Sequence, residues 1–168
     1  MNRFAVVFLV LLVGLFSLEL WQPVQDHVIQ PFTRGLATVS AALVTPFDDS
    51  VVAQGKVLRF EDSGFAVSIE SGCNGVEAMI VLLAALLAYP ASWRARGIAI
   101  VSGFFAIQLL NLARIVSLLY LGNWNLTIFS WVHLYLWPVL IMLDVLVVFL
   151  LYLHVLNRQR PAGNPAIA

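Results

Sequence analysis

Four long apolar runs, separated by shorter polar stretches, dominate the pattern of hydrophobic and polar residues. They cover residues 4–20, 76–89, 98–121 and 134–156. A helix of about 20 apolar residues crosses the hydrocarbon core of a bilayer, and each run approaches that length, the second least closely. The pattern therefore predicts four transmembrane helices.

The first run has features of both a secretory signal peptide and a membrane anchor. Arg3 precedes it, as a basic residue precedes segments of either kind. No small-x-small cleavage site follows, because Ser17 is succeeded by bulky Leu18 and charged Glu19. We therefore expect an uncleaved anchor that ends with Trp21 at the far interface.

Residues 22–72 are more polar, and within them residues 31–43 are compatible with an amphipathic helix. Its apolar face carries Phe32, Leu36, Val39 and Leu43. The residues off that face are Thr33, Arg34 and Ser40. The short length and the charge of Arg34 favour a helix in the outer interface over a helix that spans the bilayer, which is the alternative.

Two β-like runs come next, at residues 56–60 and 65–70. The residues between them, Glu61-Asp62-Ser63-Gly64, are turn formers, and apolar residues alternate with others in the second run. Both features predict a β-hairpin. This hairpin leads directly to Cys73.

Composition agrees with a membrane protein and excludes several other classes. The chain has 168 residues, of which 61% are hydrophobic and 11% charged, about half the charge of a soluble domain. Its net charge is zero and it has no basic block, so we expect no nucleic-acid partner. Its Cys and His residues do not have metal-ligand spacing, so we expect no metal and no cofactor. We expect an all-α integral membrane protein with about four transmembrane helices and a small extracytoplasmic segment.

The arginines give the orientation. With four spans, one side of the membrane receives Arg3, Arg94, Arg96, Arg158 and Arg160. Because basic residues stay in the cytoplasm, that side is predicted to be cytoplasmic. Residues 22–72 and a short loop at 122–132 then lie outside.

The lone cysteine lies just before the second apolar run, in Ser71-Gly72-Cys73-Asn74-Gly75. Its glycines allow a tight turn and the close approach of another group. A thiol at a helix N-terminus feels the positive end of the helix dipole, which favours the reactive thiolate. The alternative is a small residue packed at a helix start.

Two further polar residues are predicted to reach the same depth from other helices. Arg114 lies about two turns from the outer end of the third run, and His133 opens the fourth. An arginine inside a span usually faces the interior of a bundle or a water-filled cavity. Asn111 lies one turn before it on nearly the same face, where it can hold or hydrate the guanidinium.

These residue types suit nucleophilic catalysis by a cysteine. His133 is the candidate base for Cys73, and Arg114 can stabilise a thiolate or an oxyanion but cannot serve as a base. The alternatives are a packed cysteine, an interfacial histidine and an arginine that forms a structural ion pair with Glu77.

The same residues resemble the exosortase/archaeosortase family of membrane-embedded cysteine transpeptidases. That family has Cys-x-Gly at the outer start of one span, Asn-x-x-Arg in the next and a later histidine. Here these motifs read Cys73-Asn74-Gly75, Asn111-Leu112-Ala113-Arg114 and His133. Many members have serine where this chain has Asn74. Residues 68–78 and 133–137 look most like the exosortase H branch.

The resemblance covers roughly residues 31–156, and together with the apolar runs and the arginines it predicts a single membrane domain over residues 1–168. Its parts are an anchor at 1–21, an extracytoplasmic segment at 22–72, a three-helix catalytic region at 73–156 and a cytoplasmic tail at 157–168. It also implies Cys73 as nucleophile, His133 as base and then acid, and Arg114 as electrostatic stabiliser, with Asn111, Asn74, Gly75 and Glu77 in support.

The implied partners are exported proteins that end in a short motif, a transmembrane helix and a basic tail, with motifs of the Ile-Pro-Thr-Leu type for the H branch. The implied location is the bacterial inner membrane, with the active site facing outward. The competing hypothesis is a non-enzymatic membrane subunit that binds a partner at its outer face. A thiol oxidoreductase is disfavoured, because no second cysteine is present to resolve a disulfide.

Overall fold

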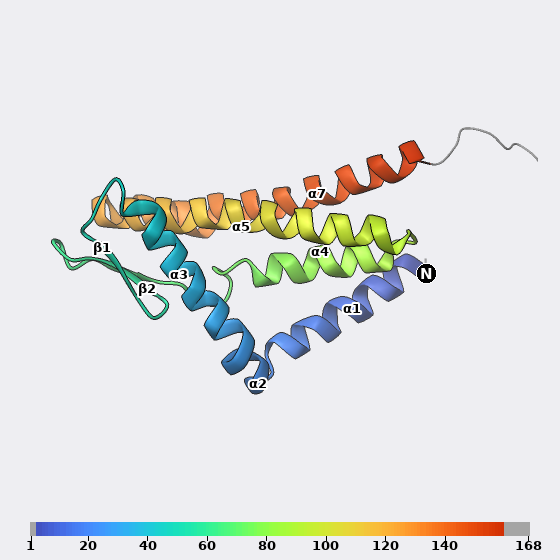
Figure 1. The fold of residues 1–168 in the computed structure, drawn as a ribbon, viewed down its shortest axis with the longest axis horizontal. Coiled ribbons are helices and arrows are strands. Elements are labelled where there is room, and N and C mark those ends of the chain that lie inside the picture. The colour runs from blue at the N-terminus through green and yellow to red at the C-terminus, as the bar shows by residue number, and fades with distance from the viewer. Residues whose placement is uncertain (1–2, 160–168) are drawn as a thin grey trace, which may run out of the picture.

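The computed structural model describes residues 3–159 (Figure 1). In chain order its elements are α1 (Arg3–Glu19), α2 (Gln22–Val24), the π-helical turn η1 (Gln25–Ile29), α3 (Gln30–Val44), β1 (Val51–Gln54), β2 (Val57–Phe60), β3 (Ala66–Ser68), α4 (Val76–Ala88), α5 (Trp93–Trp124), α6 (Leu126–Trp131), the π-helical turn η2 (Val132–Leu136) and α7 (Trp137–Gln159). Residues 160–168, which include Arg160 and most of the tail predicted at 157–168, lie outside the described residues. The predicted all-α membrane fold with a small extramembrane β-element is confirmed.

Within residues 3–159, two helices are long and apolar enough to cross a membrane. The first is α5, and the second is the helix Leu126–Arg158, which comprises α6, η2 and most of α7. They lie side by side along the long axis of the molecule (Figure 1). Together they form the frame on which the shorter elements pack.

The turn between these two helices is much tighter than predicted. The predicted loop at residues 122–132 is wrong, because α5 continues to Trp124 and α6 begins at Leu126. Asn125 makes the turn possible. Its side-chain oxygen accepts hydrogen bonds from the backbone N–H groups of Thr127 (2.9 Å) and Ile128 (3.1 Å) and so caps α6.

The central helix α4 is apolar but has only 13 residues. At 1.5 Å per residue it is about 20 Å long, shorter than a hydrocarbon core of about 30 Å. It ends at Ala88 because Tyr89 adopts an extended conformation (φ −82°, ψ 131°), which the following Pro90 favours. α4 contacts α1, α5 and α7, so it lies inside the bundle.

The first helices form a bent pair. The helix direction bends by 70° between α1 and the helical segment Gln22–Val44. Figure 1 shows the pair as a V with α2 at its vertex. Counted as one broken span, the pair brings the candidate spans to three. The predicted number of about four is reached only if α4 is included as well.

The helix predicted at residues 31–43 is present as α3, but it buries a different face. Thr33 and Ser40, predicted to lie off the apolar face, are buried, whereas Val39 and Leu43 are exposed. The reason is that α3 packs against β1, β2 and α5. Small and medium side chains suit this close packing, and the buried apolar residues are Leu36, Ala37, Ala41 and Val44.

The sheet has three antiparallel strands in the order β1-β2-β3. The predicted hairpin is present as β2 and β3, in the register Leu58↔Val67. The sequence pattern missed β1, which pairs with β2 across the turn at Gly55. One core joins the sheet to α3 and α5, and its largest members are Leu36, Val44, Val51, Leu58, Phe60, Ile69, Ile115 and Leu119.

Candidate active site

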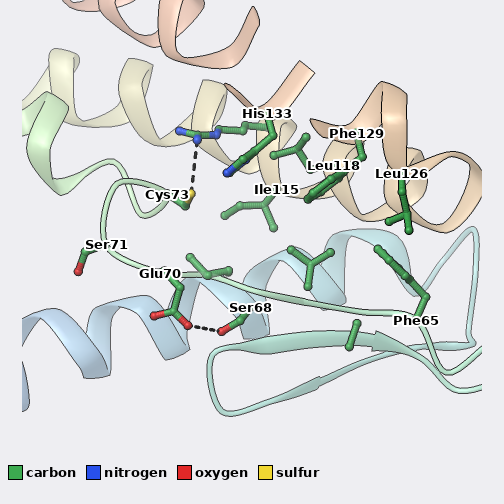
Figure 2. Close-up of a pocket in the computed structure, with 14 residues that line it drawn as sticks. Phe65, Ser68, Glu70, Ser71, Cys73, Ile115, Leu118, Leu126, Phe129 and His133 are labelled. Atoms are coloured by element: carbon green, nitrogen blue, oxygen red, sulfur yellow. Dashed lines mark hydrogen bonds between the residues drawn. The ribbon is translucent and has the colours of Figure 1, made fainter. Parts of the chain in front are cut away.

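A pocket of about 390 Å³ lies between β3 and the α5–α6 turn, and it contains all three predicted catalytic residues. Figure 2 shows Cys73 and His133 facing this pocket from different segments of the chain. Its lining residues are Phe65, Ala66, Val67, Ser68, Ile69, Glu70, Ser71, Cys73, Arg114, Ile115, Leu118, Leu126, Phe129 and His133. The fold therefore brings the thiol, the guanidinium and the imidazole together.

Cys73 lies in the loop that joins β3 to α4, two residues before the N-cap Gly75. Its backbone N–H donates to the carbonyl of Glu70 (2.9 Å), which closes a tight turn. Gly72 has φ +85°, in the left-handed region that favours glycine. The thiol is half-buried and points into the pocket (Figure 2).

Arg114 holds this loop from the side of α5. One terminal nitrogen donates to the carbonyl of Gly72 (3.1 Å), and the other donates to the sulfur of Cys73 (3.4 Å). The residue is 6% exposed, so its charge is shielded from bulk water and is aimed at the sulfur. This contact is drawn as a dashed line in Figure 2.

Arg114 and Glu77 do not form the ion pair that was the alternative prediction for them. Among residues 3–159 the only ion pair is that of Lys56 and Glu70. The carboxylate of Glu77 instead accepts a hydrogen bond from the backbone N–H of Gly72. The Gly72 peptide groups are thus held by Glu77 at the N–H and by Arg114 at the carbonyl.

Burial raises the pKa of the Cys73 thiol above its ordinary value. The charge of Arg114 opposes this effect, while the charges of Glu77 and Glu70 add to it, and the net shift is upward. The helix dipole was predicted to favour the thiolate, and desolvation of the half-buried thiol acts in the opposite direction, because burial penalises the charged form.

His133 lies within a helix and not at its start, since α6 already begins at Leu126. It is part of the π-helical turn η2, an uncommon geometry that often marks functional positions. The imidazole stacks on Phe129, with 5.5 Å between ring centroids and 3° between the ring planes. Its Nδ1 atom is buried without a hydrogen-bond partner, and no hydrogen bond joins it to Cys73 in residues 3–159.

Asn74, the residue after Cys73, is 1% exposed and forms hydrogen bonds with residues of α3, α4 and α5. Its side chain donates to the hydroxyl of Thr33 on α3 (3.2 Å) and accepts from the N–H of Val76 (3.0 Å). Its carbonyl accepts from Gln108 on α5 (3.4 Å). The side-chain amide of Asn74 thus donates to α3 and accepts from the start of α4, while its backbone carbonyl is held by α5.

Gly75 and Asn111 lie where the cysteine loop meets α5. Gly75 has φ +78°, and a Cβ atom there would lie 2.8 Å from Nε2 of Gln108 and 3.5 Å from Cγ of Asn111. Asn111 is fully buried, and neither its amide oxygen nor its nitrogen has a hydrogen-bond partner in the described residues. The predicted contact of Asn111 with Arg114 is thus not a direct hydrogen bond.

The family model described as Transmembrane exosortase (Exosortase_EpsH) matches residues 2–158, nearly the whole chain. The chain belongs to the transmembrane exosortase family. No curated protein and no solved structure matches it. Exosortases act on exported proteins with C-terminal sorting signals, so membership supports a protein-sorting function in the membrane.

The structure of this exosortase also shows parts of the pocket that sequence reasoning missed. Leu126 and Phe129 form one wall, and they fall in the stretch predicted to be a loop. The signal for the helix was present in Asn125, a strong N-cap residue. Sequence reasoning also missed Gln108, which does not line the pocket but holds the carbonyl of Asn74. Gln108 precedes Asn111 by three residues, and this spacing predicts that both lie on the same face of the helix.

No group of three or more His, Cys, Asp or Glu side chains that could hold a metal ion occurs in residues 3–159. The ionisable side chains that line the exosortase pocket are one thiol, one guanidinium, one imidazole and the carboxylate of Glu70, and the hydroxyls of Ser68 and Ser71 line it as well. This set can supply a nucleophile, a fixed positive charge and a proton carrier.

Proposed function

We propose that the chain is a membrane-embedded cysteine transpeptidase that cleaves the C-terminal sorting signal of exported proteins through a thioester. The observation that carries the proposal is the contact of 3.4 Å between Arg114 and the sulfur of Cys73, inside a pocket that also contains His133. Family membership supports the same direction.

The proposed reaction has two steps. In the first, the sulfur of Cys73 attacks the scissile carbonyl while its proton passes to His133. The C–N bond then breaks, the proton of His133 goes to the leaving amine, and the C-terminal tail departs as the thioester forms. In the second, His133 takes a proton from an acceptor amine or water, which attacks the thioester carbonyl. The C–S bond breaks, and His133 returns the proton to the sulfur, so that the thiol is regenerated.

Arg114 has a separate role in this scheme. Its guanidinium is fixed by the Gly72 carbonyl and faces the sulfur, so it can stabilise the thiolate and the oxyanion of the tetrahedral intermediate. It transfers no proton in the reaction, because a guanidinium stays protonated in proteins. Asn74, Gly75 and Glu77 hold the loop, and Asn111 supports the arginine side of the pocket.

The proposed substrates are exported proteins with a C-terminal motif, a transmembrane helix and a basic tail. The resemblance to the H branch favours motifs of the Ile-Pro-Thr-Leu type. The proposed location is the bacterial inner membrane, with the pocket outside the cytoplasm. Proteins with such signals in the same genome are the first substrates to test.

Replacing the nucleophile tests this function. We expect Cys73→Ser and Cys73→Ala to accumulate in the membrane at normal levels and to leave a signal-bearing substrate unprocessed. A serine hydroxyl must lose a much less acidic proton than a thiol. The measurement is the processing of a co-reconstituted substrate in proteoliposomes.

The control is Ser130→Ala, which removes a hydroxyl that donates to the carbonyl of Leu126 within α6. This variant should process at the normal rate. Normal processing by both Cys73 variants would reject the transpeptidase and favour the non-enzymatic subunit, which needs no thiol.

A further inference from the structure

The outer edge of the sheet is unpaired, and it lies beside the candidate nucleophile. β3 pairs with β2 on one side only, because the strand order is β1-β2-β3. An unpaired strand edge presents backbone N–H and C=O groups that can bond another extended chain. This edge belongs to the segment that leads directly to Cys73.

The register shows which backbone groups are free. The N–H of Phe60 donates to the carbonyl of Phe65 (2.9 Å), and the N–H of Ile69 donates to the carbonyl of Lys56 (3.0 Å). In an antiparallel pair, hydrogen-bonded residues alternate with residues whose backbone groups point the other way. Ala66 and Ser68 are the alternate residues, so their N–H and C=O groups point away from β2.

These free groups face the pocket. The pocket is lined on one side by the whole run from Phe65 to Ser71 and on the other by α5 and α6. Figure 2 shows this run with Phe65 at one end, Ser68 and Glu70 along it and Cys73 just beyond the other end. The far wall is apolar and consists of Ile115, Leu118, Leu126 and Phe129.

We propose that the segment of the substrate that contains the scissile bond binds in this pocket as a fourth strand, paired with the free edge of β3. The inference rests on the proposed function, since the occupant is the sorting signal itself. Backbone hydrogen bonds to Ala66 and Ser68 hold the segment extended and deliver its scissile carbonyl to Cys73. The pocket volume of about 390 Å³ lies within the usual range for ligand sites.

In this binding mode, affinity and specificity come from different contacts. Main-chain hydrogen bonds bind any extended segment, whereas pockets for alternate side chains select its sequence. Side chains of the added strand that point toward α5 and α6 meet the apolar wall, and those between them point away from it. We therefore expect a signal in which every second residue near the scissile bond is selected for apolar character.

Proline at Ser68 tests the edge on the protein side. Ser68→Pro removes an N–H that points away from β2 and leaves the ladder bonds of Val67 and Ile69 in place, and proline is tolerated on edge strands. The matched control is Ser68→Ala, which removes the exposed hydroxyl and keeps the N–H. We expect the proline variant to raise the KM for a signal peptide by roughly three- to tenfold over the alanine variant, the value of one hydrogen bond, with little change in kcat.

An N-methyl scan of the signal peptide tests the same contact with the unmodified protein in proteoliposomes. Each methyl group removes one peptide N–H. We expect the KM to rise with a period of two along the residues that pair with β3, because only alternate N–H groups face the edge.

The outcomes separate this inference from the proposed function. If the protein cleaves the peptide but the scan has no period of two and the two Ser68 variants have equal KM values, the added strand is wrong and the transpeptidase stands. If the unmodified protein cleaves no peptide with a sorting signal, the proposed function fails and the inference fails with it.

Discussion

At Cys73, burial and a neighbouring charge act on the same thiol in opposite directions. Burial raises the pKa of Cys73, and the guanidinium of Arg114 lowers it in part. A thiol that is neutral at rest does not react without a base. In this account His133 takes the proton, and Arg114 stabilises the anion that results.

The two partners should therefore respond differently to pH. In His133→Ala the base is lost, but the fraction of thiolate grows as the pH rises toward the raised pKa of Cys73, so processing should recover in part. In Arg114→Gln the loss of the positive charge raises that pKa further, so the same increase in pH should not restore processing. The measurement is a pH series of substrate processing in proteoliposomes.

Arg114→Lys is the matched variant for this series. It keeps the charge but cannot donate to the Gly72 carbonyl and the Cys73 sulfur through a planar fork. We expect a loss on the order of 100- to 1000-fold, the usual cost of removing an oxyanion donor. Equal recovery of the His133 and Arg114 variants at high pH, or full activity in either, would contradict the division of roles.

At the scale of elements, the loop from Gly72 to Gly75 depends on the close approach of α4 to α5. Gly75, the N-cap of α4, is left-handed, and a Cβ atom there would lie 2.8 Å from Nε2 of Gln108, so the Gln108 side chain would have to shift. Because Gln108 also donates to the carbonyl of Asn74, a shift of Gln108 would disturb the residue next to Cys73.

We expect Gly75→Ala to reduce processing by at least about tenfold, because a shift of the loop moves the sulfur away from Arg114. The matched control is Gly64→Ala. Gly64 is also left-handed (φ +71°) but has nothing within 4 Å of an added Cβ, so this change adds backbone strain without a clash. Gly64→Ala should accumulate and process nearly normally, and equal losses in both variants would mean that strain alone explains the effect.

The sequence predicted those elements whose signal is long and regular. Four apolar runs gave the main helices, and alternation with turn residues gave β2 and β3. It failed at β1, whose Val51-Val52-Ala53-Gln54 does not alternate apolar and polar residues, and at the buried face of α3, which is decided by packing against the sheet. The tight turn at Asn125 was missed because apolar and polar residues are mixed there.

For the candidate site, the residue types and their shared depth could be predicted, but their individual partners could not. Cys73, Arg114 and His133 each lie near the outer end of an apolar run. The hydrogen bond from the N–H of Gly72 to Glu77 involves a backbone group, which no sequence pattern identifies. The raised pKa of Cys73 depends on how deeply the loop is buried, which is a property of the assembled fold.

At the scale of the whole molecule, the pocket and the arginine-rich turns lie at opposite ends. Figure 1 shows the sheet at one end, and the start of α1, the α4–α5 turn and the end of α7 at the other. Arg3, Arg94, Arg96 and Arg158 belong to this second end. The positive-inside rule then predicts that this second end lies in the cytoplasm and that the pocket faces outward.

Reporter fusions test this orientation. Fusions at Val51 and Trp124 should report an extracytoplasmic location, because these residues lie at the end of the molecule that carries the sheet. A fusion at Gly97 should report the cytoplasm, because Gly97 lies near the start of α5, at the opposite end. The matched pair for each site is one reporter that is active only outside and one that is active only inside. A cytoplasmic signal at Val51 would contradict the orientation and the access of exported substrates to Cys73.

The thioester on Cys73 is the central claim, and trapping it with hydroxylamine is the most direct test. Hydroxylamine attacks a thioester and leaves a hydroxamate on the N-terminal fragment of the substrate. We predict that the unmodified protein in proteoliposomes yields this hydroxamate, detected by mass spectrometry, in a proportion that rises with hydroxylamine concentration, and that Cys73→Ala yields none. A cleaved fragment that carries only a free carboxylate at every concentration, or hydroxamate formed equally by Cys73→Ala, would contradict the account.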